Sequence, residues 1–78
     1  MILDINIDGE NTYFEIKDIA PIALNDMLQR ARYNKCIFLS IVVKNPQLSA
    51  HEWYSRVPEA IVDKFIERII KYQEVPYA

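Results

Sequence analysis

Residues 58–73, PEAIVDKFIERIIKYQ, carry the clearest structural pattern in this chain. Apolar residues recur in adjacent pairs every four residues, and charged residues fill the positions between them; the apolar set is Ile61, Val62, Phe65, Ile66, Ile69 and Ile70. This spacing predicts an amphipathic helix from about Pro58 to Gln73, with a wide stripe that is buried against the rest of the domain. Proline suits the first turn of a helix, and Pro76 prevents the helix from continuing.

A second helix is expected just before this one. Ser49 followed three residues later by Glu52 is a capping box, in which each side chain bonds to the backbone of the other residue. The box predicts a short helix over residues 50–56, which presents Trp53 and Tyr54. The residue before a proline avoids the helical region, so the two helices are expected to separate at Pro58.

The N-terminal residues alternate in polarity as strands do. Ile5 and Ile7 point one way and their polar neighbours the other, and Phe14 and Ile16 repeat the pattern after Asp8-Gly9. Asp-Gly is a strong signal for a tight hairpin turn. We therefore expect a β-hairpin that pairs residues 2–8 with 12–17.

The middle of the chain is harder to interpret. Pro21 and the near-helical spacing of apolar residues after it predict a helix over about 20–32, which Tyr33-Asn34-Lys35 would break. Residues 36–43 form an apolar run without a period of two, although their residue types favour a strand, so this segment is either a buried helix or a third strand. The chain of 78 residues fits one domain, 1–78, with a hairpin at 2–17 and a helical part at 20–74. The expected fold is α+β: an N-terminal hairpin followed by three or four packed helices.

The residues needed for common catalytic and metal sites are missing from the sequence. There is one cysteine, Cys36, one histidine, His51, and one glycine, Gly9. One Cys and one His cannot build the usual four-ligand zinc site within a chain, and a phosphate-cradling loop needs several glycines. We expect a buried, inert Cys36 and an exposed His51 at the start of a helix. No enzyme activity, catalytic residue, cofactor or metal is therefore expected.

Charge and hydropathy restrict the class of partner. The sequence pI is about 5.2, and acidic residues are interleaved with the basic ones, so nucleic-acid binding is not expected. The acids are concentrated at the N-terminus: residues 1–26 carry a net charge of −5 and residues 27–78 one of +3. The longest apolar run, 36–43, falls far short of the roughly 20 residues that span a bilayer. A single cysteine favours a reducing compartment, so we expect a cytoplasmic protein with no membrane association.

The order of features in the C-terminal half resembles that of small tail assembly chaperones of tailed bacteriophages. The resemblance rests on Lys44-Asn45-Pro46-Gln47-Leu48-Ser49, then the Arg56-Val57-Pro58 step, then the helix over 60–70. Tyr13-Phe14-Glu15-Ile16-Lys17-Asp18-Ile19 is also similar to the family's strand leading into its first helix. The family often has leucine where this chain has Val57. The resemblance implies a non-enzymatic protein, often oligomeric, that coats the tape measure protein in the bacterial host cell, and it implies that residues 36–43 are helical.

These observations lead to a protein-binding function with two main alternatives. In the first, an assembly chaperone holds an amphipathic segment of a partner by hydrophobic docking, with Trp53, Tyr54, Tyr72 and Tyr77 as the expected partner contacts; Phe65, a further candidate, is expected to be core. In the second, the protein is a small acidic regulator or inhibitor from a mobile element, which binds an enzyme or protein complex through its N-terminal hairpin. A structural subunit of a larger particle is a third possibility, and homo-oligomerisation fits the opposite charges of the two halves.

Overall fold

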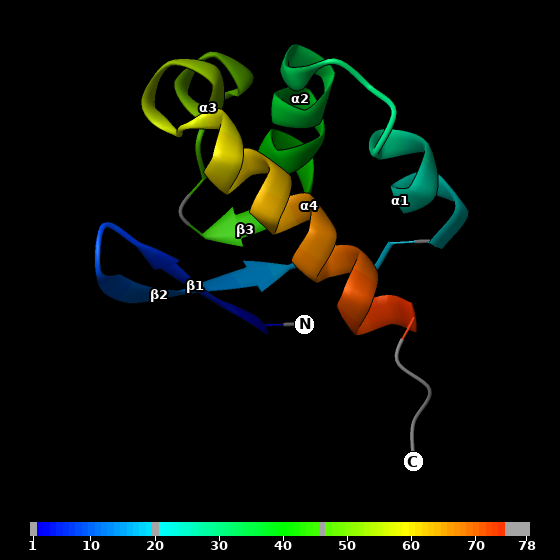
Figure 1. The fold of residues 1–78 in the computed structure, drawn as a ribbon, viewed down its shortest axis with the longest axis horizontal. Helices are drawn as coiled ribbons and strands as arrows, with labels where there is room; N and C mark the ends of the chain where they lie inside the picture. The colour runs from blue at the N-terminus through cyan, green and yellow to red at the C-terminus, as the bar shows by residue number, and fades with distance from the viewer. Residues whose placement is uncertain (1, 20, 46, 75–78) are drawn as a thin grey trace.

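The computed structural model describes residues 2–19, 21–45 and 47–74, and within these ranges it describes no side chains for residues 21–23, 73 and 74. A hairpin leads into helices, and one further short strand lies among them (Figure 1). The elements in chain order are β1 (Ile2–Ile7), β2 (Glu10–Ile16), α1 (Pro21–Met27), α2 (Arg32–Val42), β3 (Val43–Asn45), α3 (Ala50–Arg56) and α4 (Glu59–Glu74). The expected α+β fold, a hairpin followed by helices, is confirmed.

The hairpin turns at the Asp-Gly pair, as predicted. Asp8 and Gly9 both have positive φ angles, 53° and 86°, and Ile7 pairs with Glu10 on either side of them. Two consecutive left-handed residues define the hairpin turn whose twist matches that of the flanking strands. The Asn6 side chain supports the turn, because its Oδ1 accepts a hydrogen bond from the Gly9 N–H at 3.1 Å.

The sheet has the order β1-β2-β3, and both pairings are antiparallel. The pairing of β2 with β3 is short and contains a register shift between Glu15 and Ile16. Two further contacts hold β3 in place: the Lys17 N–H donates to the Val42 carbonyl at 3.0 Å, and Lys44 forms an ion pair with Glu15 at 3.2 Å. The sheet therefore has one long outer strand, β1, and one short outer strand, β3.

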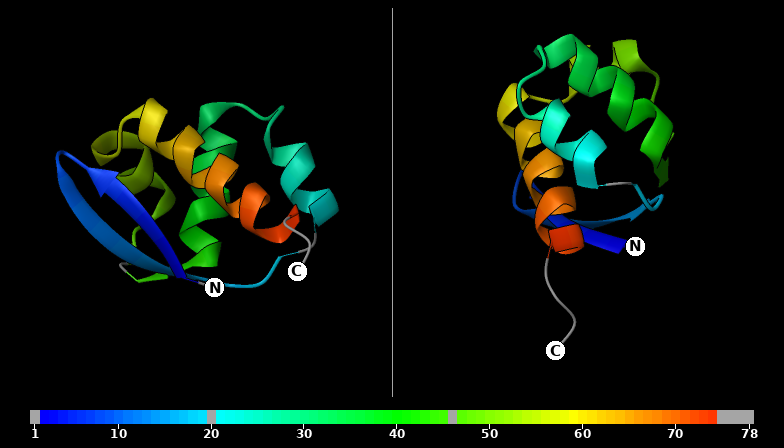
Figure 2. Two further views of the ribbon diagram at one scale, coloured as in Figure 1. Left: turned by 60° about the horizontal axis from the view of Figure 1, so that its bottom comes forward. Right: turned by 90° about the vertical axis from the view of Figure 1, so that its right-hand side faces the viewer.

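The helices cover one face of the sheet and leave the other open (Figures 1 and 2). Leu3, Ile5, Phe14 and Ile16 point into the core, whereas Ile2 and Tyr13, on the opposite face, are 63% and 65% exposed. The Phe65 ring on α4 lies at the centre of the core. Its centroid is 4.8 Å from that of Phe14 and 5.1 Å from that of Trp53, both in edge-to-face geometry. One aromatic cluster thus joins the hairpin, α3 and α4.

The helix predicted over 20–32 is too long. α1 ends at Met27, residues 28–30 form a turn in which each N–H donates to the carbonyl three residues earlier, and Ala31 is extended. The predicted break at 33–35 is also wrong, because these residues form the first turn of α2. The Arg32 side chain explains where α2 begins: its Nη2 donates to the carbonyls of Tyr54 and Val57, at 2.7 and 3.0 Å, which anchors this turn against α3.

The sequence of segment 36–43 was compatible with a helix or a strand, and the segment contains both. Residues through Val42 are helical, as the family resemblance implies, and Val43 begins β3. The remaining helices follow their local signals closely. Ser49 and Glu52 form both bonds of the capping box, α3 spans the predicted residues 50–56, and α4 begins at Glu59, directly after Pro58.

Candidate protein-binding surfaces

Helix α2 carries apolar residues on two different faces. Cys36, Leu39 and Val42 are buried in the core, whereas Ile37 and Ile41 are 39% and 60% exposed. Residues four apart lie on the same side of a helix, so Ile37 and Ile41 form one exposed apolar strip. A helix that is apolar on two sides requires a second covering surface, and the described part of the domain does not supply one for this strip.

The exposed strip of α2 forms one wall of an open groove against α1. The groove has a volume of about 280 Å³ and is lined by Met27, Arg30, Asn34, Ile37, Phe38 and Ile41. We call this the α1–α2 groove. Its lining is almost entirely apolar apart from Arg30 and Asn34. Such a surface is suited to apolar side chains of a partner and offers few polar groups to orient a small substrate.

The turn between α1 and α2 fixes the position of the one charged residue in the groove. Arg30 forms an ion pair with Asp26, with Nη2 2.6 Å from Oδ2, and its Nε also donates to the same oxygen at 3.1 Å. Because both residues are about half exposed, the pair contributes little to the stability of the domain. The bonded Arg30 side chain lies along the lining of the groove.

The structure separates the aromatic residues that the sequence predicts as partner contacts. Trp53 is 1% exposed and packs on Phe65, so it is a core residue and does not contribute to a surface. The prediction that Trp53 contacts a partner is wrong. Helix α3 has only two turns, and Trp53 is its one buried residue, so this side chain packs the helix onto the core. Phe65 is fully buried, as expected.

Tyr54 lies on the surface but is already engaged. It is 44% exposed; the Arg32 guanidinium lies 4.6 Å from its ring centroid and the Tyr33 ring packs edge-on at 5.7 Å. Tyr72 is 51% exposed near the end of α4. α3 and the end of α4 lie at opposite ends of the molecule, so Tyr54 and Tyr72 do not form one site (Figure 1). Tyr77 lies outside the described residues.

The acidic hairpin forms a second distinct surface. Asp4, Asp8, Glu10 and Glu15 are all exposed. Of these four, only Glu15 forms an ion pair with another described residue, Lys44. Asp8 lies in the turn at the tip of the hairpin and Glu10 directly follows it. This cluster is therefore available to a basic partner.

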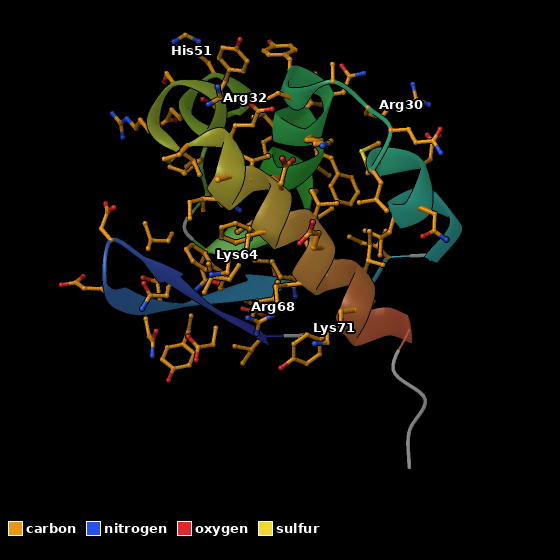
Figure 3. The ribbon with its side chains drawn as sticks, in the orientation of Figure 1. Arg30, Arg32, His51, Lys64, Arg68 and Lys71 are labelled. Carbon is orange, nitrogen blue, oxygen red and sulfur yellow. The ribbon has the colours of Figure 1, made fainter. Side chains whose placement is uncertain are left out.

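Cys36 and His51, whose side chains could take part in catalysis or metal binding, do not lie together in one site. Cys36 is fully buried; burial raises the pKa of its thiol, and this effect outweighs the opposing influence of Arg32. His51 is exposed on the outer side of α3 (Figure 3). Within the ranges that the structure describes, no group of three His, Cys, Asp or Glu side chains is placed to hold a metal ion.

Comparisons of the chain with protein-family models, with curated proteins and with solved structures find no match. Among the described helices, none combines the length and the apolar character needed to cross a membrane.

Sequence reasoning did not single out the residues of the α1–α2 groove. The signal was present in the continuous apolar run at 36–43, because a helix built from such a run must bear apolar residues on more than one face. The contribution of Met27 and Arg30 could not be found this way, since it depends on the turn at residues 28–30 that sequence reasoning placed inside a helix.

Proposed function

We propose that this protein is a non-enzymatic assembly chaperone, similar in role to the tail assembly chaperones of bacteriophages, and that the α1–α2 groove holds an amphipathic helix of its partner. The observation that carries the proposal is the exposed apolar strip of Ile37 and Ile41 in a groove whose other apolar lining residues are Met27 and Phe38. A groove between two helices accepts the apolar face of a third helix at positions spaced by three or four residues.

The binding energy that this groove can supply favours a complex that forms reversibly. Fully burying an isoleucine side chain contributes about 1.5–3 kcal/mol, so covering the exposed parts of two of them, with matching residues of the partner, supports a reversible complex. Reversibility suits a chaperone, because the partner must later be released for assembly. In the proposed role the partner is the tape measure protein, whose long helical segments expose such apolar faces before the tail is built.

The experiment is co-expression of this protein with a phage tape measure protein, followed by affinity capture. Ile41→Glu places a charge in the groove and is expected to abolish capture. Ile2→Glu is the matched control, because it changes the same residue type at nearly the same exposure, 63% against 60%, on the far side of the sheet. Equal capture by both variants, at unchanged thermal stability, would overturn the proposal.

The acidic hairpin supports a second candidate function, that of a small regulator that binds a basic surface of an enzyme or protein complex. The observation in its favour is that Asp4, Asp8 and Glu10 are exposed and form no ion pair among the described residues. Asp8→Lys combined with Glu10→Lys should abolish partner capture in this case and leave it unchanged in the chaperone case. Ile41→Glu should have the opposite pattern of effects.

A further inference from the structure

The outer edge of the sheet at β1 is long, and none of the residues that the structure describes pairs with it. Within the described residues β1 pairs only with β2, and the register places Ile7 opposite Glu10 across a two-residue turn. Residues that flank such a turn form a hydrogen-bonded pair, and bonded and non-bonded pairs then alternate along the hairpin. The backbone groups of Leu3, Ile5 and Ile7 therefore face β2, whereas those of Asp4 and Asn6 face away from the sheet.

This edge lacks most of the devices that usually prevent a strand from pairing with another chain. Proteins protect long edges with proline, charged side chains (lysine above all), bulges or a very short strand. Asp4 is the one charged residue of β1. β1 is six residues long, contains no proline or lysine, and pairs with β2 without interruption. By contrast, β3 at the other edge has three residues and a register shift. β1 is therefore the edge to which an extended segment can be added.

Helix α4 runs alongside β1, in the opposite direction, in Figure 1 and in the left view of Figure 2. The flank of α4 over this side carries a row of cations, Lys64, Arg68 and Lys71 (Figure 3). None of the three forms an ion pair with another described residue, although Glu67 is exposed between them. Tyr72 lies one turn beyond Arg68 on the same side of the helix and is 51% exposed.

The spacing of this row is close to that of alternate residues in a strand. Lys64 and Arg68 are four residues apart and Arg68 and Lys71 three, which corresponds to roughly 6 and 4.5 Å along a helix axis. Alternate side chains of a strand, which lie on one face, are separated by about 6.6 Å. A strand added beside β1 would thus present every second side chain to successive turns of α4.

From this juxtaposition we infer that β1 binds an extended segment of a partner protein by strand addition, and that the segment has an acidic residue at every second position. The backbone of Asp4 and Asn6 pairs with the added strand. Its acidic side chains face the α4 row of Lys64, Arg68 and Lys71. The side chains between them lie on the open face beside Ile2 and Asp4, where apolar residues fit better than acids. This site is separate from the α1–α2 groove and does not depend on the proposed chaperone function.

A second copy of the chain is a poor occupant of the same edge. Antiparallel pairing of two β1 strands would bring the two Asp4 side chains near each other and place the two α4 cation rows side by side. Both juxtapositions are repulsive, so the charges favour an acidic partner over self-pairing.

The probe is an octapeptide of alternating Glu and Val, added to the isotope-labelled full chain and followed by NMR. We expect the amide signals of Asp4 and Asn6 to shift and to gain protection from hydrogen exchange, with a Kd below about 1 mM. A block peptide with the same composition, all Glu followed by all Val, is the matched control and should bind at least about tenfold more weakly. Lys64→Glu with Arg68→Glu should weaken the alternating peptide by a similar factor.

Two further measurements separate strand addition from simple charge attraction. Methylation of alternate backbone nitrogens of the peptide removes its donors without changing its charge, and should abolish binding. Asp4→Pro removes an N–H that the sheet does not use and should do the same, whereas Asp4→Asn should retain binding. The inference is overturned by equal binding of the two peptides, by full binding of the methylated peptide, by no binding at about 1 mM, or by a β1-paired dimer in sedimentation.

Discussion

Among single residues, Trp53 shows most clearly how this small core is built. Its ring is fully enclosed and packs edge-on against Phe65, yet its Nε1 has no hydrogen-bond partner among the described residues. A buried donor without a partner reduces the net stabilisation that the ring provides. The contribution of Trp53 to stability therefore comes from its apolar volume.

Substitution of Trp53 tests this account. Trp53→Ala is expected to lower the free energy of unfolding by about 3–5 kcal/mol, because a large core side chain is lost and a cavity remains. Trp53→Phe keeps an aromatic ring and removes no hydrogen bond, so its effect should be much smaller. Urea unfolding followed by far-UV circular dichroism measures both. If the Phe variant lost as much stability as the Ala variant, the Nε1 group would have to be making a bond that the structure does not show.

At the scale of elements, the sequence best predicts the features whose signal lies in a few adjacent residues. The hairpin turn, the capping box and the proline step at Pro58 each depend on a few adjacent residues, and each appears where the sequence predicts it. The turn at residues 28–30 contains no glycine or proline. It forms because α1 packs on α4 whereas α2 packs mainly on α3, so the chain must change direction between them. Such a requirement is not visible in local sequence.

The same distinction applies to the candidate surfaces. The acidic hairpin and Tyr72 were accessible to sequence reasoning, because short strands and helix faces alternate predictably. The α1–α2 groove and the cation row beside β1 were not, because each joins elements whose packing is set by the whole core. Trp53 was misplaced for the same reason: an aromatic residue in a short helix can point either way until its neighbours are known.

The capping box of α3 gives a prediction at this scale that involves pH. Hydrogen bonds from the Ser49 backbone and side chain, the backbone bond being the larger effect, lower the pKa of the partly exposed Glu52 carboxyl in the folded protein. The stabilising contribution of Glu52 is thus complete above the pKa of the unfolded glutamate, and it is lost as the pH falls through the lower folded value. Ser49→Ala should lower the free energy of unfolding by about 1 kcal/mol near neutral pH.

Measurement of unfolding free energy across the acidic range checks both parts. Wild type and Glu52→Gln should converge in stability as the pH falls below the folded pKa of Glu52, because the neutral carboxyl accepts the Ser49 N–H bond less strongly. Ser49→Ala keeps that backbone donor and should retain most of the pH dependence of wild type. Ser55→Ala, at an exposed position later in the same helix, is the matched control and should change stability little at any pH. A constant difference between Glu52→Gln and wild type down to low pH would contradict the role assigned to Glu52.

For the whole molecule, the Phe14–Phe65–Trp53 cluster makes the sheet and the helices depend on each other. A lone hairpin is only marginally stable, so β1 and β2 should not persist once α4 is lost. We expect Phe14→Ala, which changes the hairpin alone, to shift the unfolding midpoints of Trp53 fluorescence and of far-UV circular dichroism equally, with a loss of about 3–5 kcal/mol. Two separate transitions would show that the hairpin and the helical part unfold independently.

The packing of β1 against α4 also has a consequence for the order of events on the ribosome. β1 precedes α4 in the chain and packs against it, so the hairpin leaves the ribosome before this covering helix. During that interval the apolar face of the nascent hairpin is open to other chains, and transiently exposed apolar surface promotes aggregation. Asp4 and Asn6 on the opposite side of β1 are exposed, and these polar side chains help to keep the nascent hairpin in solution until α4 arrives.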